Sequence, residues 1–531
     1  MPAKFKKSSV SIVFAITDKL PYAESALCDS IESALKQDQP GVKVILVDNR
    51  GPDRKLELNL SDASRVTYIA DQFKNRAAMY NAALKACDTD FILAVYNESQ
   101  CVTLTKSAVQ TMVMAATRMH PMDLVYSDYD RVESDGKRHE IKLADWHPGR
   151  VRDGEDMGLA ILYRTAAMRE CGGYDESFNA ADIYDLRLKI SESKRVAHIG
   201  NRYAGSLYTV AAPPQAHNVF DYLMEDKSSQ LEMEHALSGH LKRIGAYLEP
   251  GAHVGPVYAN GEKPEHAKDC IASVVIPVNN RPEFIGRAIE SVQAQTEQRV
   301  ETVIVVNGGD TDPTIPAVKE YMKGGAKYDA SKPPVQLIVV DINNLGLCLN
   351  TGIASANGMY YVQLDSDDRL KPDAVEKILA VFDSDPAIGM VVGSYEVSVL
   401  DEKTGKVTRD ENVPVVTHAE WTADNGRNNL LRIGGAGAPR AAHIKVIADA
   451  GWFGVNDDNE CRNYGEDYDL VNRIAERYVI GRVWDPIYEV IRHSGGTDHN
   501  IDPVTIARNN NAKDHTRLEA IHRRQQLNQS K

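Results

Sequence analysis

The two halves of the chain repeat each other. Matching segments occur in the same order in both halves, namely 31–37 (IESALKQ) with 289–295 (IESVQAQ), 44–48 (VILVD) with 303–307 (VIVVN), 80–95 with 349–364, and 184–186 (YDL) with 468–470. A tandem duplication constrains the fold strongly, because each copy must form the same kind of unit. The spacing between the matches widens slowly along the chain, which indicates insertions in the second copy.

Each copy alternates apolar, β-branched runs with amphipathic segments. The apolar runs lie at 10–16, 42–47 and 91–95 in the first copy and at 272–278, 302–306 and 360–364 in the second. Strands that alternate with helices predict a mostly parallel sheet with right-handed crossovers. We therefore expect an α/β chain with two tandem Rossmann-like domains, whose ligands bind at the carboxyl ends of the strands.

The domain boundaries follow from length and composition. A chain of 531 residues is too long for one core, because single cores stop growing at roughly 250 to 300 residues. A helical stretch over about 215–250 and a stretch rich in Gly, Pro and His over about 250–268 separate the copies. We expect a first domain at 1–214, a helical linker at 215–268, a second domain at 269–502 and a polar, loose-ended surface helix at 503–531.

Composition excludes several classes of protein. The 61 Lys and Arg against 75 Asp and Glu give a net charge of −14, which disfavours binding to nucleic acid or an anionic membrane. The seven cysteines form no CxxC pair, which favours reduced thiols in a cytoplasmic enzyme. No stretch approaches the roughly 20 apolar residues of a membrane span. The apolar run at 10–16 follows three lysines, but no small-residue cleavage site follows it, and it favours a strand over a signal peptide.

An acidic motif ends the third apolar run of the second copy. Residues 364–368 read LDSDD, with Asp365 and Asp367 two positions apart. Acid-x-acid triplets are common, and an isolated one is more often a solvated turn. At the end of a strand, however, two such carboxylates can both reach one divalent cation that also bridges substrate phosphates.

Three further features of the second copy support a nucleotide site. The segment 273–296 places Pro277, Asn279 and Arg281 around the end of the first strand, where they can hold a base and ribose. GEDYDL at 465–470 begins an amphipathic helix whose first turn contains an acidic pair. Further on, His493 supplies an imidazole, a common metal ligand. Taken singly, each has a structural explanation, such as acids that favour a helix dipole.

The order of these motifs resembles the inverting glycosyltransferases of the A-type nucleotide-sugar fold, in the large family that builds polysaccharides and O-antigens. The resemblance covers both halves and is strongest over 271–497. It implies that Asp365, Asp367 and His493 bind Mn²⁺ or Mg²⁺, that Asp467 is the general base, and that Glu466 supports it. A nucleotide-sugar donor, with a UDP-sugar favoured, and a carbohydrate or other hydroxyl acceptor are the implied partners.

The donor contacts implied by this resemblance are Pro277, Asn279, Arg281, Asn307, Asn350 and Asp365. Two positions depart from the family pattern. Asn307 replaces the acid usually found after the second strand, and Leu349 replaces the Arg that commonly precedes the Asn of the third segment. These changes leave the donor base and sugar open, and the sequence also leaves the acceptor, the linkage and the oligomeric state open.

The first copy lacks the same chemistry. In the alignment Asp365 corresponds to Tyr96, Asp367 to Glu98 and Asp467 to Ile183, while His493 falls near Pro213. At best one metal ligand survives, so we expect a noncatalytic copy that positions the acceptor, mediates assembly or supports its neighbour. The alternative is a second transferase in which Asp128 and Asp130 form a displaced metal motif.

Two other function classes are compatible with a nucleotide-binding sheet. A noncatalytic nucleotide- or glycan-binding scaffold is disfavoured by the intact set of acids and His493 in the second copy. A nucleotidyltransferase would normally carry a Gly-rich, basic phosphate loop near the first strand, whereas 276–286 (IPVNNRPEFIG) contains only Arg281 and a late Gly. Release of nucleoside diphosphate rather than pyrophosphate separates these classes.

Overall fold

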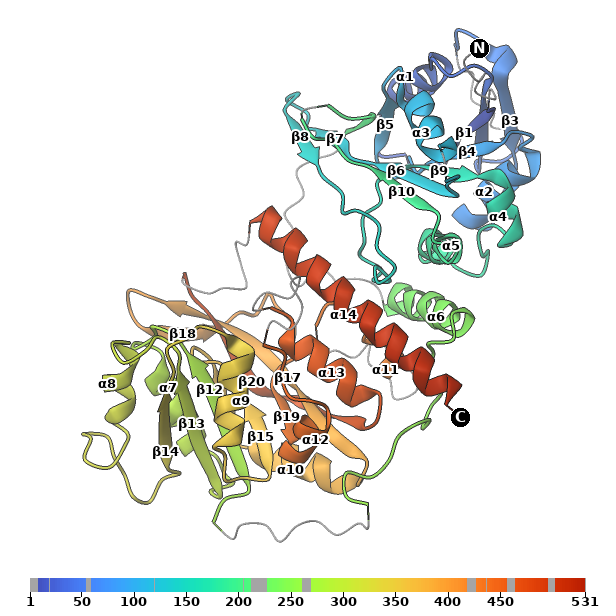
Figure 1. Cartoon of the computed structure of the whole chain (residues 1–531). Helices are drawn as coiled ribbons and strands as arrows, with labels where there is room; N and C mark the ends of the chain where they lie inside the picture. The colour runs from blue at the N-terminus through green and yellow to red at the C-terminus, as the bar shows by residue number, and fades with distance from the viewer. Residues whose placement is uncertain are drawn as a thin grey trace. The chain divides into compact units, whose positions relative to one another are not determined.

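A computed structural model of the chain divides into two compact units, Met1–Ile244 and Gly245–Lys531 (Figure 1). It describes residues 8–18, 20–53, 59–118, 120–203, 205–211, 227–259, 269–417, 426–435, 437–455, 464–494 and 502–530. Each unit contains its own α/β sheet, which confirms the predicted fold class. The central strands of both sheets are parallel as predicted, but the sheet of the second unit is mixed, because β15–β19, β17–β19, β16–β20 and β17–β18 are antiparallel pairs.

In the described part of the first unit, a seven-stranded sheet has the order β10-β6-β9-β4-β1-β2-β3, and a four-stranded sheet has the order β5-β11-β7-β8. The strands are β1 (Val10–Ile16), β2 (Val42–Asp48), β3 (Val66–Ala70), β4 (Phe91–Val95), β5 (Cys101–Leu104), β6 (Leu124–Ser127), β7 (Tyr129–Val132), β8 (Arg138–Ile141), β9 (Ala160–Arg164), β10 (Val196–Ile199) and β11 (Tyr208–Ala211). The helices are α1 (Glu24–Leu35), α2 (Arg76–Ala86), α3 (Ala108–Thr117), α4 (Thr165–Glu170), α5 (Asp182–Ser191) and α6 (Lys227–Arg243).

The second unit repeats this plan around a sheet ordered β14-β13-β12-β15-β19-β17-β20-β16, with β18 beside β17. Its strands are β12 (Ala272–Val278), β13 (Val300–Val306), β14 (Val335–Val339), β15 (Tyr360–Gln363), β16 (Arg369–Leu370), β17 (Ile388–Asp401), β18 (Lys406–Arg409), β19 (Arg440–His443) and β20 (Val479–Arg492). Its helices are α7 (Ile285–Gln293), α8 (Thr314–Lys319), α9 (Leu345–Ala354), α10 (Ala374–Ser384), α11 (Gly426–Asn429), α12 (Ile444–Asp449), α13 (Glu466–Ala475) and α14 (Pro503–Gln529).

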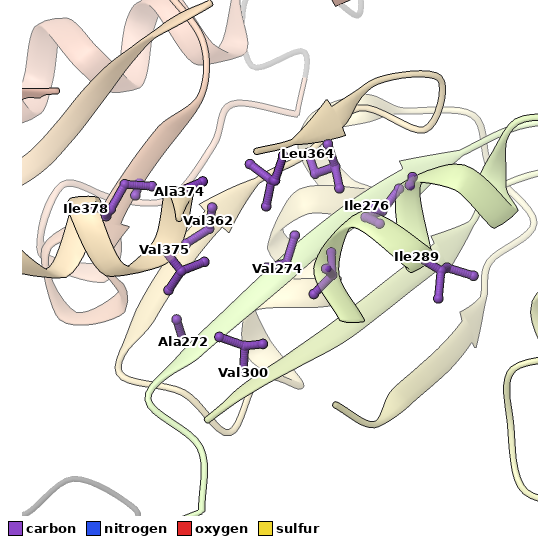
Figure 2. Close-up of a cluster of buried hydrophobic side chains, with 14 of the residues drawn as sticks. Ala272, Val274, Ile276, Ile289, Val300, Val362, Leu364, Ala374, Val375 and Ile378 are labelled. Carbon is purple, nitrogen blue, oxygen red and sulfur yellow. The ribbon is translucent and has the colours of Figure 1, made fainter. Parts of the chain in front are cut away.

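The central strand β12 is buried on both faces, as its continuous apolar sequence predicts for a parallel sheet. Because successive side chains of a strand point to opposite faces, Val274 and Ile276 pack in one cluster and Val275 packs in another. Figure 2 shows the first cluster, where β12 packs against α7 through Ile289. The second cluster contains buried apolar residues of α9 and α13. Helices therefore cover both faces of this sheet.

The strand registers of the two copies establish which residues are equivalent. Val10 lies opposite Phe91 in the first sheet, and Ala272 lies opposite Tyr360 in the second. Five residues beyond Phe91 and Tyr360 stand Tyr96 and Asp365, which supports their alignment.

At the second strand the sequence alignment is displaced by one residue. The Asn49 N–H donates to the Ile16 carbonyl at 2.9 Å, as the Asn307 N–H does to the Val278 carbonyl at 3.0 Å. Asn307 is therefore equivalent to Asn49 and not to Asp48.

The stretch predicted as a linker divides between the two units. Its described helix, α6, packs on α5, where His240 Nδ1 lies 2.9 Å from a Glu192 carboxylate oxygen. The boundary between the units follows at Ile244, inside the predicted 215–268 segment. Residues 212–226 and 260–268, with Pro213 among them, lie outside the described residues.

The C-terminal helix α14 is not the loose surface helix that its polar sequence predicts. It lies beside α13 (Figure 1), and the side chains of Arg517 and Arg524 are fully buried. Arg517 pairs with Asp514 at 2.8 Å and donates through Nε to the Leu431 carbonyl at 2.9 Å. These bonds satisfy a buried guanidinium, which is why a polar segment can belong to the core of the second unit.

Candidate active site

The site lies where the strand order reverses, at the carboxyl ends of the neighbouring strands β12 and β15. Ligands of open α/β sheets bind at such switch points. The chain turns after β12 at Asn280, a non-glycine residue with φ of 51°. Two side chains hold this turn: Asp312 accepts the Asn280 N–H at 2.9 Å, and Thr314 Oγ1 accepts the Arg281 N–H at 2.9 Å. The turn thereby fixes the start of the Arg281 side chain at the site edge.

The carboxylates of the acidic motif after β15 have two roles. One holds the backbone in place, and the others are available to a ligand. Asp368 is buried and accepts the Ile491 N–H at 2.8 Å, so it ties the motif to β20. The backbone N–H of Asp365 donates to the Tyr488 hydroxyl at 3.0 Å, which also fixes the turn. The Asp365 carboxylate accepts the Gln363 amide at 3.2 Å. Burial first, and the neighbouring Asp367 second, raise the pKa of Asp365 above its ordinary value.

Asp367, His493 and Arg281 form a triangle beside Asp365. Asp367 Oδ2 lies 3.0 Å from His493 Nε2 and 3.3 Å from Arg281 Nη1, and the two nitrogens are 3.3 Å apart. His493 is 7% exposed and its ring packs against Phe284 with centroids 4.3 Å apart. The structure thus brings together Asp367 and His493 from segments 126 residues apart in sequence.

The donor set fits a divalent cation in its chemistry. Two carboxylates two residues apart after β15 and an imidazole directly after β20 are ligands that such ions accept. Among the described residues no group of three His, Cys, Asp or Glu side chains is already arranged to hold a metal. In this arrangement the Arg281 guanidinium supplies the positive charge beside Asp367.

The acidic pair of the GEDYDL segment begins helix α13. Gly465 adopts a left-handed φ of 81°, which glycine tolerates, and the turn places both acids in the first helical turn. Asp467 Oδ2 pairs with Arg440 Nη2 at 2.9 Å. Burial alone would raise the pKa of Asp467, but Arg440 and then Lys513 outweigh it and hold the pKa below its ordinary value. Burial and the charge of Asp467 raise the pKa of Glu466 to about 7.

The remaining predicted donor contacts differ in whether their side chains are already hydrogen-bonded within the protein. Asn307, 7% exposed at the end of β13, donates to the Asn343 side chain at 3.2 Å, and its buried Oδ1 has no hydrogen-bond partner among the described residues. Asn279 is exposed, and Pro277 is half-buried near the end of β12. The Asn350 side chain donates to the Phe453 carbonyl at 2.9 Å and accepts the Phe453 N–H at 3.0 Å, which indicates a scaffold role.

The first copy repeats that scaffold role. Asn81 donates to the Tyr174 carbonyl at 2.9 Å and accepts the Tyr174 N–H at 3.0 Å. An asparagine that serves the same backbone bridge in both copies needs no ligand to explain its position. The family pattern alone could not separate this role from donor contact.

Sequence reasoning missed three residues of this site. Arg440 begins β19 directly after Pro439, Tyr488 lies on β20, and Lys513 lies on α14. Each acts on a predicted acid, since Arg440 and Lys513 lower the pKa of Asp467 and the Tyr488 hydroxyl accepts the Asp365 N–H. The only sequence signal was an unexplained Arg at the start of a short apolar strand in 438–443 (APRAAH).

At the equivalent edge of the first copy, a phenol and an aliphatic side chain replace Asp365 and Asp467. The Tyr96 hydroxyl lies 3.0 Å from that of Tyr163 and 2.8 Å from that of Tyr174, all in the buried core. Asp182, which begins α5 as Glu466 begins α13, is fully buried in a pair with Arg76 at 3.0 Å. Ile183 follows it in the position of Asp467.

The carboxylates Asp128 and Asp130 of the first copy do not form a metal site in the described residues. Asp128 accepts the Leu143 N–H at 2.8 Å and the Asn201 N–H at 2.7 Å, and it lies 2.8 Å from His198 Nε2. These contacts engage both carboxylate oxygens in holding loops together. Asp130 lies within β7 and faces Arg138 at 3.6 Å.

The α/β sheet of the second unit, with carboxylates at a strand end, fits a nucleotide-dependent transferase, and sequence comparison agrees with this class. Residues 12–96 and 273–441 each match the model of glycosyl transferase family 2. Each unit of the chain therefore contains a segment of glycosyltransferase family 2.

Curated relatives match over part of their length. A chondroitin synthase of Escherichia coli is 26% identical over 243 residues, which cover 46% of this chain and 32% of the relative. The O-antigen biosynthesis protein RfbC of Myxococcus xanthus is 24% identical over 323 residues, which cover 59% of this chain and 24% of the relative. The chain thus spans a third or less of these relatives.

Solved structures show weaker likenesses. The mannosyltransferase PcManGT of Pyrobaculum calidifontis, in complex with GDP-Man and Mn²⁺, aligns with a TM-score of 0.33 and 14% identity, covering 56% of this chain and 83% of that one. TarS of S. aureus aligns with a TM-score of 0.32 and 15% identity, covering 42% and 37%. Likenesses this low say nothing about a ligand of this chain. None of the helices in the described residues combines the length and apolar character that membrane crossing requires.

Proposed function

We propose that the second unit transfers a sugar from a nucleotide-sugar donor to a hydroxyl acceptor, with inversion, in glycan or polysaccharide assembly. One observation carries this proposal. Asp365 at the end of β15 and the Glu466–Asp467 pair at the start of α13 lie close enough that all three acids raise the pKa of Arg440, and Asp467 raises that of Asp365. A metal-type carboxylate and a candidate base thus share one site. The names of the relatives in polysaccharide synthesis support the same class.

On the donor side, the proposed contacts are Pro277, Asn279, Arg281, Asn307 and Asp365. The buried Asn307 Oδ1 supports this, because a buried acceptor without a partner is costly and a bound base or ribose can donate to it. Arg281 already faces a carboxylate, and a diphosphate would offer it a second anionic partner. A UDP-sugar remains the favoured donor by family resemblance.

Asp365, Asp367 and His493 would hold Mn²⁺ or Mg²⁺ next to the donor diphosphate. A bound divalent cation there supplies neutralisation of the departing nucleoside diphosphate. The protein's own groups hold the ligands in place, since Tyr488 bonds the Asp365 backbone and Phe284 packs on the His493 ring.

Asp467 is the proposed general base, which takes the proton from the acceptor hydroxyl as the donor bond breaks. Its pairing with Arg440 keeps it ionised and oriented at neutral pH. Glu466 is the rival, because a pKa of about 7 is nearer the value that suits a general base at neutral pH. Separate substitution of the two acids distinguishes them.

For the first unit we propose a noncatalytic role in acceptor positioning, assembly or support. Tyr96 and Ile183, in the positions of Asp365 and Asp467, can neither hold a hard cation well nor accept a proton. The contacts of Asp128 support this over a second active site. Cytoplasmic location and any oligomer stay predictions.

The test incubates the full chain with a panel of nucleotide sugars, an acceptor pool and Mn²⁺. The proposal expects nucleoside diphosphate from at least one donor. Pyrophosphate release would indicate a nucleotidyltransferase, and binding without turnover across the panel would indicate a scaffold.

A further inference from the structure

A cavity of about 520 Å³ opens beside the candidate metal site of the second unit. Its walls come from the turn after β12, the first turn of α7, the β17–β18 turn and the end of β20. Arg281 and His493 form its inner end, where both also contact Asp367. The cavity is within the usual range of small-molecule pockets, and it is larger than a single inorganic anion needs.

Arg287 gives this cavity an uncompensated positive charge. The side chain is half-buried in the first turn of α7, and its Nη2 donates to the Gly405 carbonyl at 3.2 Å. Its Nη1 is buried without a hydrogen-bond partner, and Arg287 forms no ion pair with any residue in the described part of the chain. Arg287 is only half-buried, and a guanidinium that lines a cavity without a protein counter-charge can pair with an anionic ligand.

The surrounding charges agree with an anion near Arg287. The N-terminal end of α7 faces the cavity with its positive dipole end, and Arg281 adds a second guanidinium. Two carboxylates also line the cavity: Glu402 accepts the Ser494 N–H at 2.9 Å, and Glu283 is exposed to solvent. Neither of them pairs with Arg287. The described lining of the cavity therefore carries both guanidinium and carboxylate groups, which suits an oxyanion on a hydroxyl-rich molecule.

The residues of the cavity wall bear on which part of a substrate could bind here. Neither Glu466 nor Asp467 is among the described residues that line the cavity. A sugar held by Arg287 thus has neither proposed base beside it among the described lining residues, which suits a unit next to the reacting sugar. Such a unit of the same acceptor chain fits, because the inner end of the cavity adjoins the proposed donor phosphates.

We propose that this cavity is an acceptor subsite for an anionic sugar unit, whose carboxylate or phosphate pairs with Arg287. This inference rests on the proposed transferase function for its role, but the binding itself does not need a donor. Arg287 donates charge-assisted hydrogen bonds to the oxyanion, and Glu402 and Asn280 in the cavity wall can bond to the sugar hydroxyls.

The test measures binding to the full-length protein in the absence of donor and metal, by ligand-observed NMR and calorimetry. The probes are glucuronic acid for the carboxylate source, glucose 1-phosphate for the phosphate source, and neutral glucose. We expect one of the two anionic sugars to bind at least about tenfold more tightly than glucose, since loss of one partner of a sheltered charge pair is usually worth that much. Equal binding of all three, or no binding of either anion, overturns the proposal.

Variants locate the bound anion. Arg287→Ala should weaken the preferred anionic sugar by about tenfold or more, and Arg287→Lys should retain part of the affinity. Arg299→Ala is the matched control, because Arg299 precedes β13 at the opposite edge of the sheet and pairs with Glu297 at 2.7 Å. A thermal unfolding curve checks that each variant is folded. Undiminished binding by folded Arg287→Ala overturns the site, whereas absence of nucleoside diphosphate release from any donor refutes the transferase function separately.

Discussion

Arg440 Nη2 lies 2.9 Å from Asp467 Oδ2, so the first strand residue after Pro439 neutralises the first turn of α13. The pair fixes a carboxylate that would otherwise be costly to keep ionised in a sheltered site. The two adjacent acids of α13 also differ in pKa, because the pKa of Asp467 is lowered while that of Glu466 is raised. The first two of the following predictions test this division of roles.

Asp467→Asn should retain donor binding and lose about 10²- to 10⁴-fold in turnover, because the amide is nearly isosteric and cannot accept a proton. The matched control is Asp469→Asn, whose carboxylate pairs with Arg473 at 2.8 Å on the same helix. Steady-state rates with a fixed donor measure both. Equal losses in the two variants, or loss of donor affinity in Asp467→Asn, would show that Asp467 is not the base.

Glu466 should make stability depend on pH. Its pKa is about 7 in the folded chain, against an ordinary value of 4.5, so folding favours its protonated form. The stabilisation is complete below about pH 4.5 and is lost as pH rises through 7. Glu466→Gln removes this loss, so the second unit of the variant should be more stable than wild type at pH 8, by about 3 kcal/mol.

Urea unfolding of the whole chain at pH 5 and pH 8, followed by a signal from the second unit, measures this difference. The advantage of Glu466→Gln should shrink toward zero at the lower pH. An advantage that is the same at both pH values contradicts the raised pKa.

Chelation should abolish turnover, and Mn²⁺ or Mg²⁺ should restore it, because a diphosphate leaving group needs charge neutralisation. His493→Ala should shift the metal concentration needed for half-maximal rate upward, since one ligand is lost. The measurement is turnover against free metal concentration after dialysis with EDTA. Full turnover in excess EDTA would show that the reaction needs no divalent metal.

The tyrosine cluster of the first unit should be structural. Tyr96→Phe deletes a hydroxyl that lies 3.0 Å from Tyr163 and 2.8 Å from Tyr174, and this should destabilise the first unit by about 1 to 3 kcal/mol. Transfer should not change. Thermal unfolding and turnover of the same preparation report the two effects, and a lost rate with unchanged stability would instead place Tyr96 in an active site.

Much of the fold was predictable because it depends on local patterns. The β-branched runs at Val10–Ile16 and Ala272–Val278 are buried on both faces, so their apolar sequence indicates parallel strands directly. The polar sequence of α14 misled, because buried Arg517 donates to the Leu431 carbonyl after α11 and buried Arg524 donates to the Arg427 carbonyl of α11, and no local pattern carries that information.

The site was predictable where the acids are adjacent in sequence and not where charge comes from a distant strand. Asp365, Asp367 and the pair at 466–467 stand in short motifs. Arg440 and Lys513 come near Asp467 only because β19 and α14 fold against α13. The two hydrogen bonds between the Asn350 side chain and the Phe453 backbone likewise depend on the tertiary position of Phe453.

The central claim is that the acidic edge of the second unit performs the transfer and the equivalent edge of the first does not. The direct test compares nucleoside diphosphate release by full-length Asp365→Ala and Glu98→Ala, each folded and each assayed with the active donor and Mn²⁺. We predict that Asp365→Ala loses nearly all release and that Glu98→Ala retains most of it. Retained release in Asp365→Ala, or its loss in Glu98→Ala alone, would contradict the account.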